Sequence, residues 1–384
     1  MRPVFIASDH LLSSLGFSTQ AHVEALMNER TGISLHKNHS FLKKEVFASL
    51  IDESPLKELS EVFDPTQNFT RLERMMLFSI RQSLKQTGIK LHKPRTLLII
   101  STTKGNIDLL ASKGASTRPS KRLYLGTLAK TIGQELECSH QPLVISNACI
   151  SAALGIIIAA RLIRANKYDH IVVCGADMVS EFIISGFQAL KAMSPNPCRP
   201  YDQAREGITL GEGCGTLILT ADSAKARDTP IQLIGGATSN DANHISGPSR
   251  TAEGLYQAIK QCLTEANISP NNIDFLSAHG TATQYNDEME AIACQRAGLL
   301  AAPINSFKGY FGHTLGAAGV LESVLSIRSM QNNTLFKSLG YETSGTSYPL
   351  NIITHTQKSE INYCLKTASG FGGCNAALLF AKYS

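Results

Sequence analysis

Three residues of this chain have side chains that together suit covalent acyl transfer: Cys149, His279 and His313. Cys149 follows the apolar run Leu143-Val-Ile-Ser-Asn-Ala and precedes a run of small and apolar residues typical of a helix. The two histidines lie far downstream, each beside glycine. A thiolate attacks thioesters, and a helix N-terminus lowers the pKa of a cysteine. The pattern therefore predicts a cysteine nucleophile with a lowered pKa and two imidazoles that assist it.

Each of these residues also has an ordinary explanation when it is taken alone. A free cysteine is most often a small buried residue, and a histidine beside glycine is most often part of a turn or of the core. The chemical hypothesis thus depends on all three residues meeting in space. The elements that position them must bring residues separated by more than a hundred positions into one site.

Those elements follow an alternating pattern of strands and helices. Short apolar runs rich in β-branched residues predict strands at 96–101, 143–146, 170–175, 215–220, 231–236, 273–279, 303–306 and 376–380. The intervening stretches predict helices at 71–86, 151–166, 251–267 and 317–330. Continuously apolar strands alternating with helices indicate sheets that are covered on both faces, which is an α/β fold.

The polar segment 222–230 is the expected internal boundary. We therefore predict an N-terminal domain at 1–222, which contains the cysteine, and a C-terminal domain at 223–384, which contains both histidines. Each half has a strand that leads into a turn of small residues and then a helix, which suggests that the halves are distant structural repeats.

Composition excludes several classes of protein. With 384 residues, 43% hydrophobic and 17% charged, the chain is globular. A net charge of +5 is too small for a dedicated nucleic-acid binder but suits an acidic partner. Nine cysteines without a Cys-x-x-Cys pair favour reduced thiols and no structural metal. The N-terminus lacks a signal-peptide pattern and no apolar run could span a bilayer, so we expect a cytoplasmic protein without membrane contact.

Seven motifs occur in order along almost the whole chain. They are Asn147-Ala-Cys149, Pro200-Tyr-Asp202, Leu210-Gly-Glu-Gly213, His279-Gly-Thr-Ala-Thr, Lys308-x-x-x-Gly-His313, Gly316-Ala-Ala-Gly-x-x-Glu322 and Gly370-Phe-Gly-Gly-Cys-Asn375. This set resembles the β-ketoacyl-acyl carrier protein synthases, the elongating condensing enzymes with a Cys-His-His site. The resemblance implies a thiolase-like fold, in which two similar α/β halves form a five-layered α-β-α-β-α sandwich, and an association into dimers.

The same resemblance implies a role for each matching residue. Cys149 would hold the acyl chain, and the backbone N–H groups of Cys149 and Phe371 would form the oxyanion hole. His279 and His313 would stabilise the enolate that malonyl decarboxylation produces. The remaining matches are Lys308, which organises the histidines, Glu322, which pairs with that lysine, Asp287 and Glu290, which support the site, Thr281 and Thr283, which contact pantetheine, and Phe371 again, as the gate of a glycine-rich loop. No bound cofactor is implied, because phosphopantetheine arrives on the acyl carrier protein.

Acyl carrier proteins are acidic, so a basic surface is expected near the site. Arg71, Arg74, Arg81 and Lys85 fall on one side of a predicted amphipathic helix. Of these, Arg71 and Arg74 match docking positions of the family, as does Lys191, and Lys121 and Arg122 lie near another such position. The ordinary alternative is a solvated helix face.

The chain departs from the family pattern at two places, and two rival functions must be considered. Cys374 stands where the family usually has threonine, and it is either an oxidation-prone thiol or a small filler. The stretch between Gly105 and Pro142 is shorter than in typical members of the family, which leaves the preferred acyl chain length open. A thiolase would need a second cysteine in a Cys-x-Gly loop, which the chain lacks where Ser369-Gly-Phe-Gly-Gly stands. A non-catalytic chain-length factor would lack Cys149. The alternatives that stay open are a homodimeric synthase of fatty acid, polyketide or polyene synthesis and the catalytic half of a heterodimer with a chain-length factor.

Overall fold

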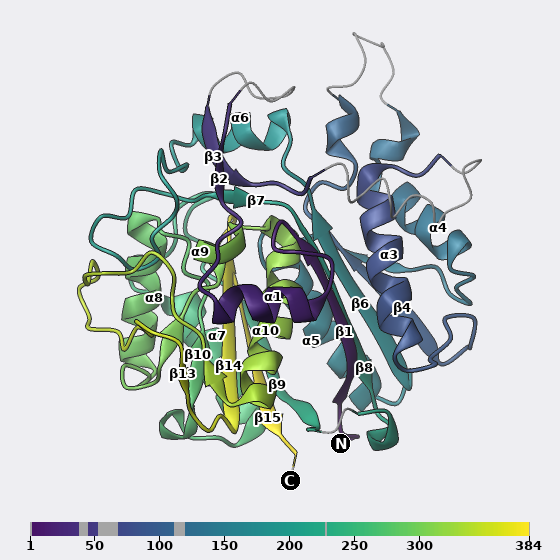
Figure 1. Cartoon of the computed structure of the whole chain (residues 1–384). Helices are drawn as coiled ribbons and strands as arrows, with labels where there is room; N and C mark the ends of the chain where they lie inside the picture. Colours follow the sequence, from purple (N-terminus) through teal and green to yellow (C-terminus); the bar gives the residue numbers. More distant parts are fainter. Residues whose placement is uncertain (1, 38–44, 53–67, 111–119, 227–228, 384) are drawn as a thin grey trace.

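The computed structural model describes residues 2–37, 45–52, 68–110, 120–226 and 229–383 (Figure 1). Two mixed sheets form its framework. The first runs in the order β1 (Phe5–Ser13), β8 (Gly213–Thr220), β6 (His170–Asp177), β4 (Thr96–Ser101) and β5 (Leu143–Ile145). The second runs in the order β9 (Ile231–Asn240), β15 (Cys374–Lys382), β14 (Tyr363–Gly370), β10 (Phe275–Ser277) and β11 (Ile304–Asn305).

The two sheets have the same topology. In each, the first strand pairs antiparallel with the last, the last pairs antiparallel with the fourth, and the second and third strands follow in parallel. The sheets are continuous through one pair of residues, Phe5 of β1 and Gln232 of β9. This equivalence confirms the expected pair of similar halves. All strands of the first sheet precede residue 222 and all strands of the second follow it, although the division into separate domains stays a prediction.

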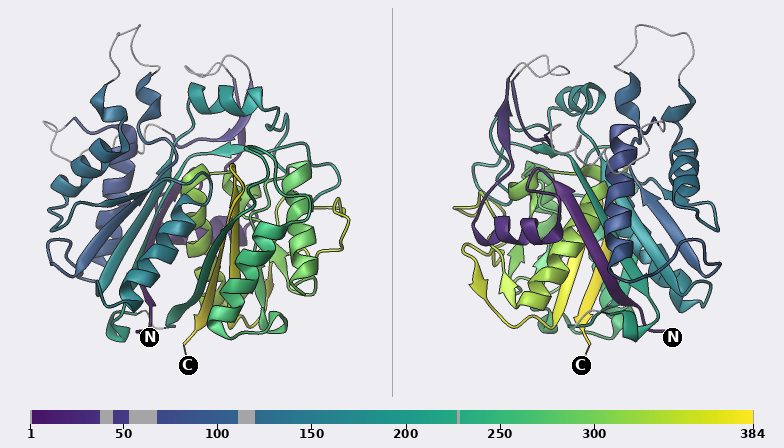
Figure 2. Two further views of the ribbon diagram at one scale, coloured as in Figure 1. Left: turned by 180° about the vertical axis from the view of Figure 1, so that it is seen from behind. Right: turned by 45° about the vertical axis from the view of Figure 1, so that its right-hand side comes forward.

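Helices make the other three layers of the sandwich. Helices α5 (Ser151–Arg164) and α10 (Ala318–Asn332) lie side by side and contact strands of both sheets, so they form the central layer (Figure 2). On the outer face of the first sheet lie α3 (Arg71–Lys85) and α4 (Leu125–Glu135). On the outer face of the second lies α7 (Glu253–Ala266), with α8 (Gln284–Arg296) packed beside it. The α-β-α-β-α arrangement is therefore confirmed.

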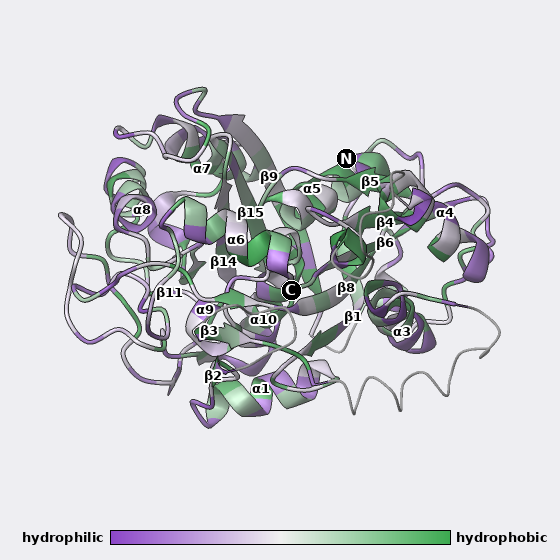
Figure 3. Cartoon of the chain, turned by 90° about the horizontal axis from the view of Figure 1, so that it is seen from above, coloured by the Kyte–Doolittle hydropathy of each residue, from purple (hydrophilic) through white to green (hydrophobic). Residues whose placement is uncertain are grey.

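Hydropathy explains these positions. Residues 152–160 of α5 are small or apolar, with Ala152, Ile156 and Ile157 fully buried, which suits a helix covered on two faces. By contrast, α3 buries one stripe only, including Leu72, Met75 and Ile80, and is begun by a capping box between Thr70 and Glu73. In Figure 3 the strands β4 and β6 are largely hydrophobic, as expected of strands that helices cover.

The remaining elements connect these layers. They are α1 (Thr19–Met27), α6 (Glu181–Ala189), α9 (Lys308–Phe311), β2 (Ser34–His36), β3 (Val46–Ser49), β7 (Leu210–Gly211), β12 (Thr334–Leu335), β13 (Gln357–Lys358) and the 3-10 turns η1 (Ile107–Leu110), η2 (Lys121–Leu123), η3 (Ser223–Lys225), η4 (Pro270–Asn272) and η5 (Leu315–Ala317). In the part of the chain that the structure describes, no helix is long and apolar enough to cross a membrane.

All eight predicted strands and four predicted helices are present, with shifted ends. One prediction about burial was wrong. The strand predicted at 143–146 was expected in the interior, but β5 is the edge of the first sheet and Leu143 is 39% exposed. The sequence pattern of an apolar run does not distinguish a covered central strand from an apolar edge. The structure also adds strands and helices that the sequence did not predict, among them β14, which carries a lysine of the site described below.

Candidate active site

Cys149 lies between the edge strand β5 and the helix α5, which begins two residues later at Ser151. The turn that presents it is tight: Ala148 has a positive φ of 43°, and the Ser151 hydroxyl donates to the Ala148 carbonyl at 2.6 Å while accepting from the N–H of Asn147 at 2.8 Å. Ser151 therefore fixes the backbone on both sides of that strained residue. Cys149 itself is only 8% exposed and lines a cavity.

His313 is the partner of the thiol. Its Nε2 lies 3.2 Å from Cys149 Sγ, within hydrogen-bond distance. The backbone of His313 is held by Thr209 and Gly211, through N–H···O bonds of 2.7 and 3.1 Å. Gly312, with a φ of 67°, turns the chain between α9 and this histidine. Nδ1 of His313 is buried and has no hydrogen-bond partner among the described residues.

The expected lowering of the thiol pKa is not observed. Burial raises the pKa of Cys149 to about 12, against 9.0 for an ordinary cysteine, and the nearby Cys374 raises it further, while Lys308 and the backbone N–H of Phe371 lower it. The prediction from helix position was therefore wrong in direction, because burial of the thiol is the largest influence on its pKa. Cys149 is thus a protonated thiol before substrate arrives.

His279 completes the triad from the second half of the chain. It follows β10, is 2% exposed, and its ring meets that of His313 edge to face, with centroids 5.1 Å apart. Lys308 Nζ lies 3.3 Å from His279 Nδ1 and also donates to the His279 carbonyl. Because an ammonium group only donates, Nδ1 must accept, so the ring proton of His279 is on Nε2. Burial, with Lys308 and Lys366 nearby, holds the pKa of both histidines well below 6.5, so both are neutral.

Behind the histidines lies a row of three buried charges. Glu322 of α10 accepts a hydrogen bond from Lys308 through Oε1 at 2.6 Å, and its Oε2 forms an ion pair with Lys366 at 2.7 Å that lacks hydrogen-bond geometry. All three side chains are at most 1% exposed. The pairing of Lys308 with Glu322 agrees with the prediction. Lys366 was missed, although a lysine inside the apolar run Tyr363-Cys-Leu-Lys-Thr-Ala is itself a signal, since a charge on a covered strand needs a buried partner.

Asp287 and Glu290, both on α8, hold the loop that carries His279. Glu290 accepts from the backbone N–H groups of His279 and Gly280, at 2.8 and 2.6 Å, and Asp287 accepts from that of Thr281 at 3.0 Å. Burial and the charge of Glu290 raise the pKa of Asp287 to about 6. The two carboxylates therefore support the loop by hydrogen bonds to its backbone and do not reach into the cavity.

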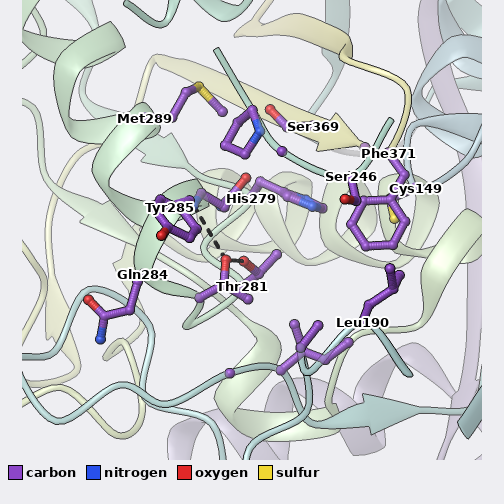
Figure 4. Close-up of a pocket in the computed structure, with 18 of the residues that line it drawn as sticks. Cys149, Leu190, Ser246, His279, Thr281, Gln284, Tyr285, Met289, Ser369 and Phe371 are labelled. Carbon is purple, nitrogen blue, oxygen red and sulfur yellow. Dashed lines mark hydrogen bonds between the residues drawn. The ribbon is translucent and has the colours of Figure 1, made fainter. Parts of the chain in front are cut away.

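The glycine-rich loop lies directly over the nucleophile (Figure 4). The backbone N–H of Phe371 donates to the Cys149 sulfur, and the Phe371 ring, 37% exposed, stacks on Phe187 with centroids 5.6 Å apart. A side chain at Gly370 would come within 3.0 Å of the Cys149 nitrogen, so only glycine permits this approach. Cys374 is buried beneath the loop, its thiol 3.4 Å from the Phe371 carbonyl, and burial raises its pKa to about 11. The burial of Cys374 and the raised pKa of its thiol both support the interpretation that this residue is a small filler.

A cavity of about 470 Å³ leads to the three residues. Its walls include Cys149, His279, His313, Thr281, Thr283, Phe371, Leu190, Lys191 and Tyr285. The hydroxyls of Thr281 and Thr283 lie 3.0 Å apart, and both residues line the cavity. Their contact with pantetheine stays a prediction. It requires both side chains to line the cavity, and both do.

The predicted docking cations separate into two groups. Lys191 is exposed at the mouth of the cavity, with a φ of 51°, and Lys121 is exposed on η2. Arg71 differs: its side chain is 16% exposed, binds Glu212 Oε1 at 2.7 Å and donates to the Ile51 carbonyl at 2.5 Å. The expectation that Arg71 offers a free charge to a carrier does not match this buried ion pair, because its guanidinium neutralises the interior carboxylate of Glu212.

The other cations predicted near the docking surface also have partners or lie away from the cavity mouth. Arg122 bonds Glu73, and Arg81 bonds Glu135. Arg74 is half-buried and makes contacts of its own. Lys85 is exposed at the far end of α3. Of the three predicted docking residues, Lys191 is thus the one whose place at the cavity mouth suits the role.

Comparison with known proteins identifies the relatives of this chain. The N-terminal domain model of β-ketoacyl synthases matches residues 1–225 and the C-terminal domain model matches residues 232–342. A 3-oxoacyl-[acyl-carrier-protein] synthase 2 from Coxiella burnetii is 27% identical over 413 aligned positions, covering 99% of each chain. The enzyme of the same name from Rhizobium meliloti is 35% identical over 281 positions, which cover 69% of this chain and 66% of that one.

Solved structures agree with the sequence comparison. A chain from the complex of a ketosynthase with its chain length factor, from Xenorhabdus doucetiae, superimposes with a TM-score of 0.85 at 26% identity, covering 100% of this chain and 98% of the other. A β-ketoacyl synthase from Burkholderia phymatum gives a TM-score of 0.86 at 24% identity and full coverage of both chains, which bears on the fold alone.

Proposed function

The chain belongs to the β-ketoacyl synthase family, and we propose that it catalyses the decarboxylative Claisen condensation of an acyl thioester with malonyl-acyl carrier protein. The observation that carries the proposal is the meeting of Cys149 with His313, at 3.2 Å, beside the ring of His279 in one cavity. These residues come from opposite halves of the chain, and the fold brings them together as the chemistry requires.

In the first step, the sulfur of Cys149 attacks the carbonyl carbon of an acyl thioester. The thiol proton passes to the departing pantetheine sulfur, with His313 Nε2 in position to relay it. The backbone N–H groups of Cys149 and Phe371 stabilise the negative charge on the carbonyl oxygen, and the N–H of Phe371 is near enough to donate to the Cys149 sulfur. The product is an acyl group on Cys149.

In the second step, the malonyl group loses carbon dioxide. The electron pair of the broken carbon–carbon bond becomes an enolate, whose oxygen needs donors as its charge develops. His279 presents such a donor, because Lys308 occupies its Nδ1 and leaves the proton on Nε2. His313 supplies the second when its ring proton is on Nε2. The enolate carbon then attacks the acyl carbonyl, and Cys149 leaves as a thiolate that regains a proton.

The acyl donor and malonyl donor are both acyl carrier proteins in this proposal. Lys191 at the cavity mouth offers a positive charge to an acidic carrier, and Thr281 and Thr283 line the path that a pantetheine arm would take. The pathway is either fatty acid synthesis or a polyketide or polyene pathway.

An association of two subunits is the second part of the proposal. The edge strand β5 exposes Leu143 next to the nucleophile turn, which supports pairing through the first half of the chain. Likeness to a ketosynthase solved with its chain length factor favours a heterodimer as the alternative to a homodimer. Native mass spectrometry of the chain alone, and of the chain co-expressed with its genomic neighbours, separates a homodimer from a mixed pair.

The decisive experiment is intact-protein mass spectrometry after exposure to a panel of acyl-acyl carrier proteins. The expected result is one acyl group, mapped by peptide digestion to Cys149, followed by its disappearance and release of a β-ketoacyl product when malonyl carrier is added. Absence of any acyl adduct across short, long, unsaturated and aryl donors, together with no decarboxylation of malonyl carrier, would overturn the proposal.

A further inference from the structure

Lys366 is a fully buried lysine that the chemistry proposed above does not use. It lies on β14, between Leu365, which packs in the outer cluster with α7, and Thr367. Its neighbours two positions away on the strand, Cys364 and Ala368, belong to the core cluster around α10. The alternation of a strand therefore points Lys366 toward the central layer, behind the two histidines.

The contacts of Lys366 are specific. Its Nζ lies 2.7 Å from Glu322 Oε2 and donates to the Thr367 carbonyl. The other oxygen of Glu322 holds Lys308, whose Nζ reaches His279 Nδ1. A continuous path of polar contacts thus runs from Lys366 through Glu322 and Lys308 to His279.

Burying an extra charge is costly unless it is paired, and here two ammonium groups share one carboxylate. A lone Lys308–Glu322 pair would already be neutral, so Lys366 is not needed to neutralise Glu322. The cost shows in Lys366 itself, since burial and the charge of Lys308 lower its pKa while Glu322 and Glu290 raise it. An arrangement that is expensive for folding and placed next to a reaction centre is a candidate for function.

We propose that Lys366 is a positioning residue for malonyl decarboxylation, which holds Glu322 so that Lys308 stays on His279 and adds a second positive charge behind both imidazoles. This inference rests on the condensing activity proposed above. Without Lys366, one oxygen of Glu322 loses its partner and the carboxylate is free to rotate away from Lys308. The negative charge of Glu322 would then also be fully cancelled by Lys308, and the potential at the enolate would become less positive.

The charged groups that face Lys366 lie on three helices and on the two histidines of the site. They are Glu322 on α10, Lys308 on α9, Glu290 on α8, and the two histidines when protonated. Both Lys308 and Lys366 disfavour protonation of His279 and His313. Removing one of the two cations should therefore let the histidines protonate at a higher pH. A histidine that is protonated before decarboxylation ends that reaction.

The test compares K366M with a matched control, K382M, on the neighbouring strand β15, where Lys382 Nζ bonds the side chain of Asn333 at an exposed position. The substrates are malonyl-acyl carrier protein for decarboxylation and an acyl carrier accepted by the wild type for acylation of Cys149. We expect K366M to lose about tenfold in decarboxylation, to keep acylation, and to shift the acid side of its decarboxylation pH profile to higher pH. K382M should match the wild type in all three measurements.

A double-substitution cycle with E322Q decides whether Lys366 acts through Glu322. If it does, K366M in the E322Q background should lose much less than tenfold, because the path is already broken. If K366M does not fold, K366Q, which keeps an N–H donor but not the charge, is measured in its place.

Unchanged decarboxylation and pH profile in a folded Lys366 variant, with an active wild type, would overturn this inference alone. Equal losses of acylation and decarboxylation would also overturn it, since they indicate a general defect of the fold. A wild type that neither accepts acyl groups nor decarboxylates malonyl carrier would instead refute the proposed function.

Discussion

Lys308 Nζ and His279 Nδ1 lie 3.3 Å apart in the interior, and this one contact fixes which nitrogen of the histidine carries its proton. The lysine can only donate, so the histidine must accept at Nδ1 and present Nε2–H to the cavity. A neutral imidazole in this tautomer is a hydrogen-bond donor for an enolate oxygen without being an acid that would quench the carbanion. The protonation state of the site is thus set by buried charges behind it.

Replacing His279 with alanine should reduce malonyl decarboxylation by about 10²–10³-fold, the usual effect of removing one donor to a developing oxyanion. His313→Ala should have a similar effect and should also slow acylation more than His279→Ala does, because His313 contacts the Cys149 sulfur at 3.2 Å. Single-turnover acylation followed by mass spectrometry, alongside release of carbon dioxide, measures both steps. Loss of acylation with intact decarboxylation in either variant would contradict these roles.

Replacing Cys149 with alanine should abolish condensation and every acyl adduct, because the covalent intermediate has no other carrier. Cys149→Gln should leave decarboxylation intact or raised, since that step needs the histidines and the backbone donors only. The matched control is Cys374→Thr, which keeps a small buried donor under the loop and should be acylated normally. An acyl group mapped to Cys374 in the wild type would reverse the assignment.

The raised pKa of Cys149, about 12, predicts slow alkylation that increases with pH. Only the thiolate reacts with iodoacetamide, so the rate should rise about tenfold per pH unit between pH 7 and 9 without levelling off. Mass spectrometry of the Cys149 peptide follows the reaction, with the Cys149→Ala chain showing the background from the other thiols. A plateau below pH 8 would mean that the helix N-terminus outweighs burial.

Charge reversal should separate Lys191 from Arg71. Lys191→Glu should raise the KM for acyl carriers, most strongly at low salt, and leave kcat with small pantetheine thioesters unchanged, because exposed charges steer a partner through an attraction that salt screens. Arg71→Glu should instead lower the Tm, since it places a carboxylate against buried Glu212. A normal Tm together with a carrier-specific KM defect in Arg71→Glu would restore Arg71 to the docking surface.

Stability should fall on mild acidification because several buried histidines are neutral in the fold, and two of them, His10 and His22, lie outside the active site. Burial lowers the pKa of His10 and of His22 from 6.5 to about 4. Because the folded state lowers the pKa of each histidine, its contribution to the free energy of unfolding is complete above pH 6.5. That contribution is lost as the pH falls from 6.5 toward 4, by up to about 3 kcal/mol for each residue. Urea unfolding between pH 7.5 and 4.5 measures the loss. His22→Gln should flatten this dependence, and an identical pH dependence in that variant would refute the role of His22.

The strand pattern was predictable because covered strands leave long apolar runs in the sequence. The eight predicted strands follow this rule, and the helices α3, α5, α7 and α10 were predictable from the apolar residues that they bury. The short helices α1 and α6 and the strand β14 do not stand out, since α1 has no sharply separated apolar face and β14 carries Lys366. The exposed edge position of β5 depends on which strands neighbour it, and no local pattern records that.

The identities of the reacting groups, and the alternation of strands and helices that builds an α/β fold, can be recognised from the order of residues alone. Glycines beside His313 and Phe371 mark, in the sequence, the places where backbones must approach closely. Only the tertiary structure decided the state of those groups. The pKa of Cys149, the tautomer of His279, the partner of Arg71 and the burial of Lys366 depend on atoms contributed by segments far apart in the chain. Desolvation and charge pairing act through space, so they appear only when the chain has folded.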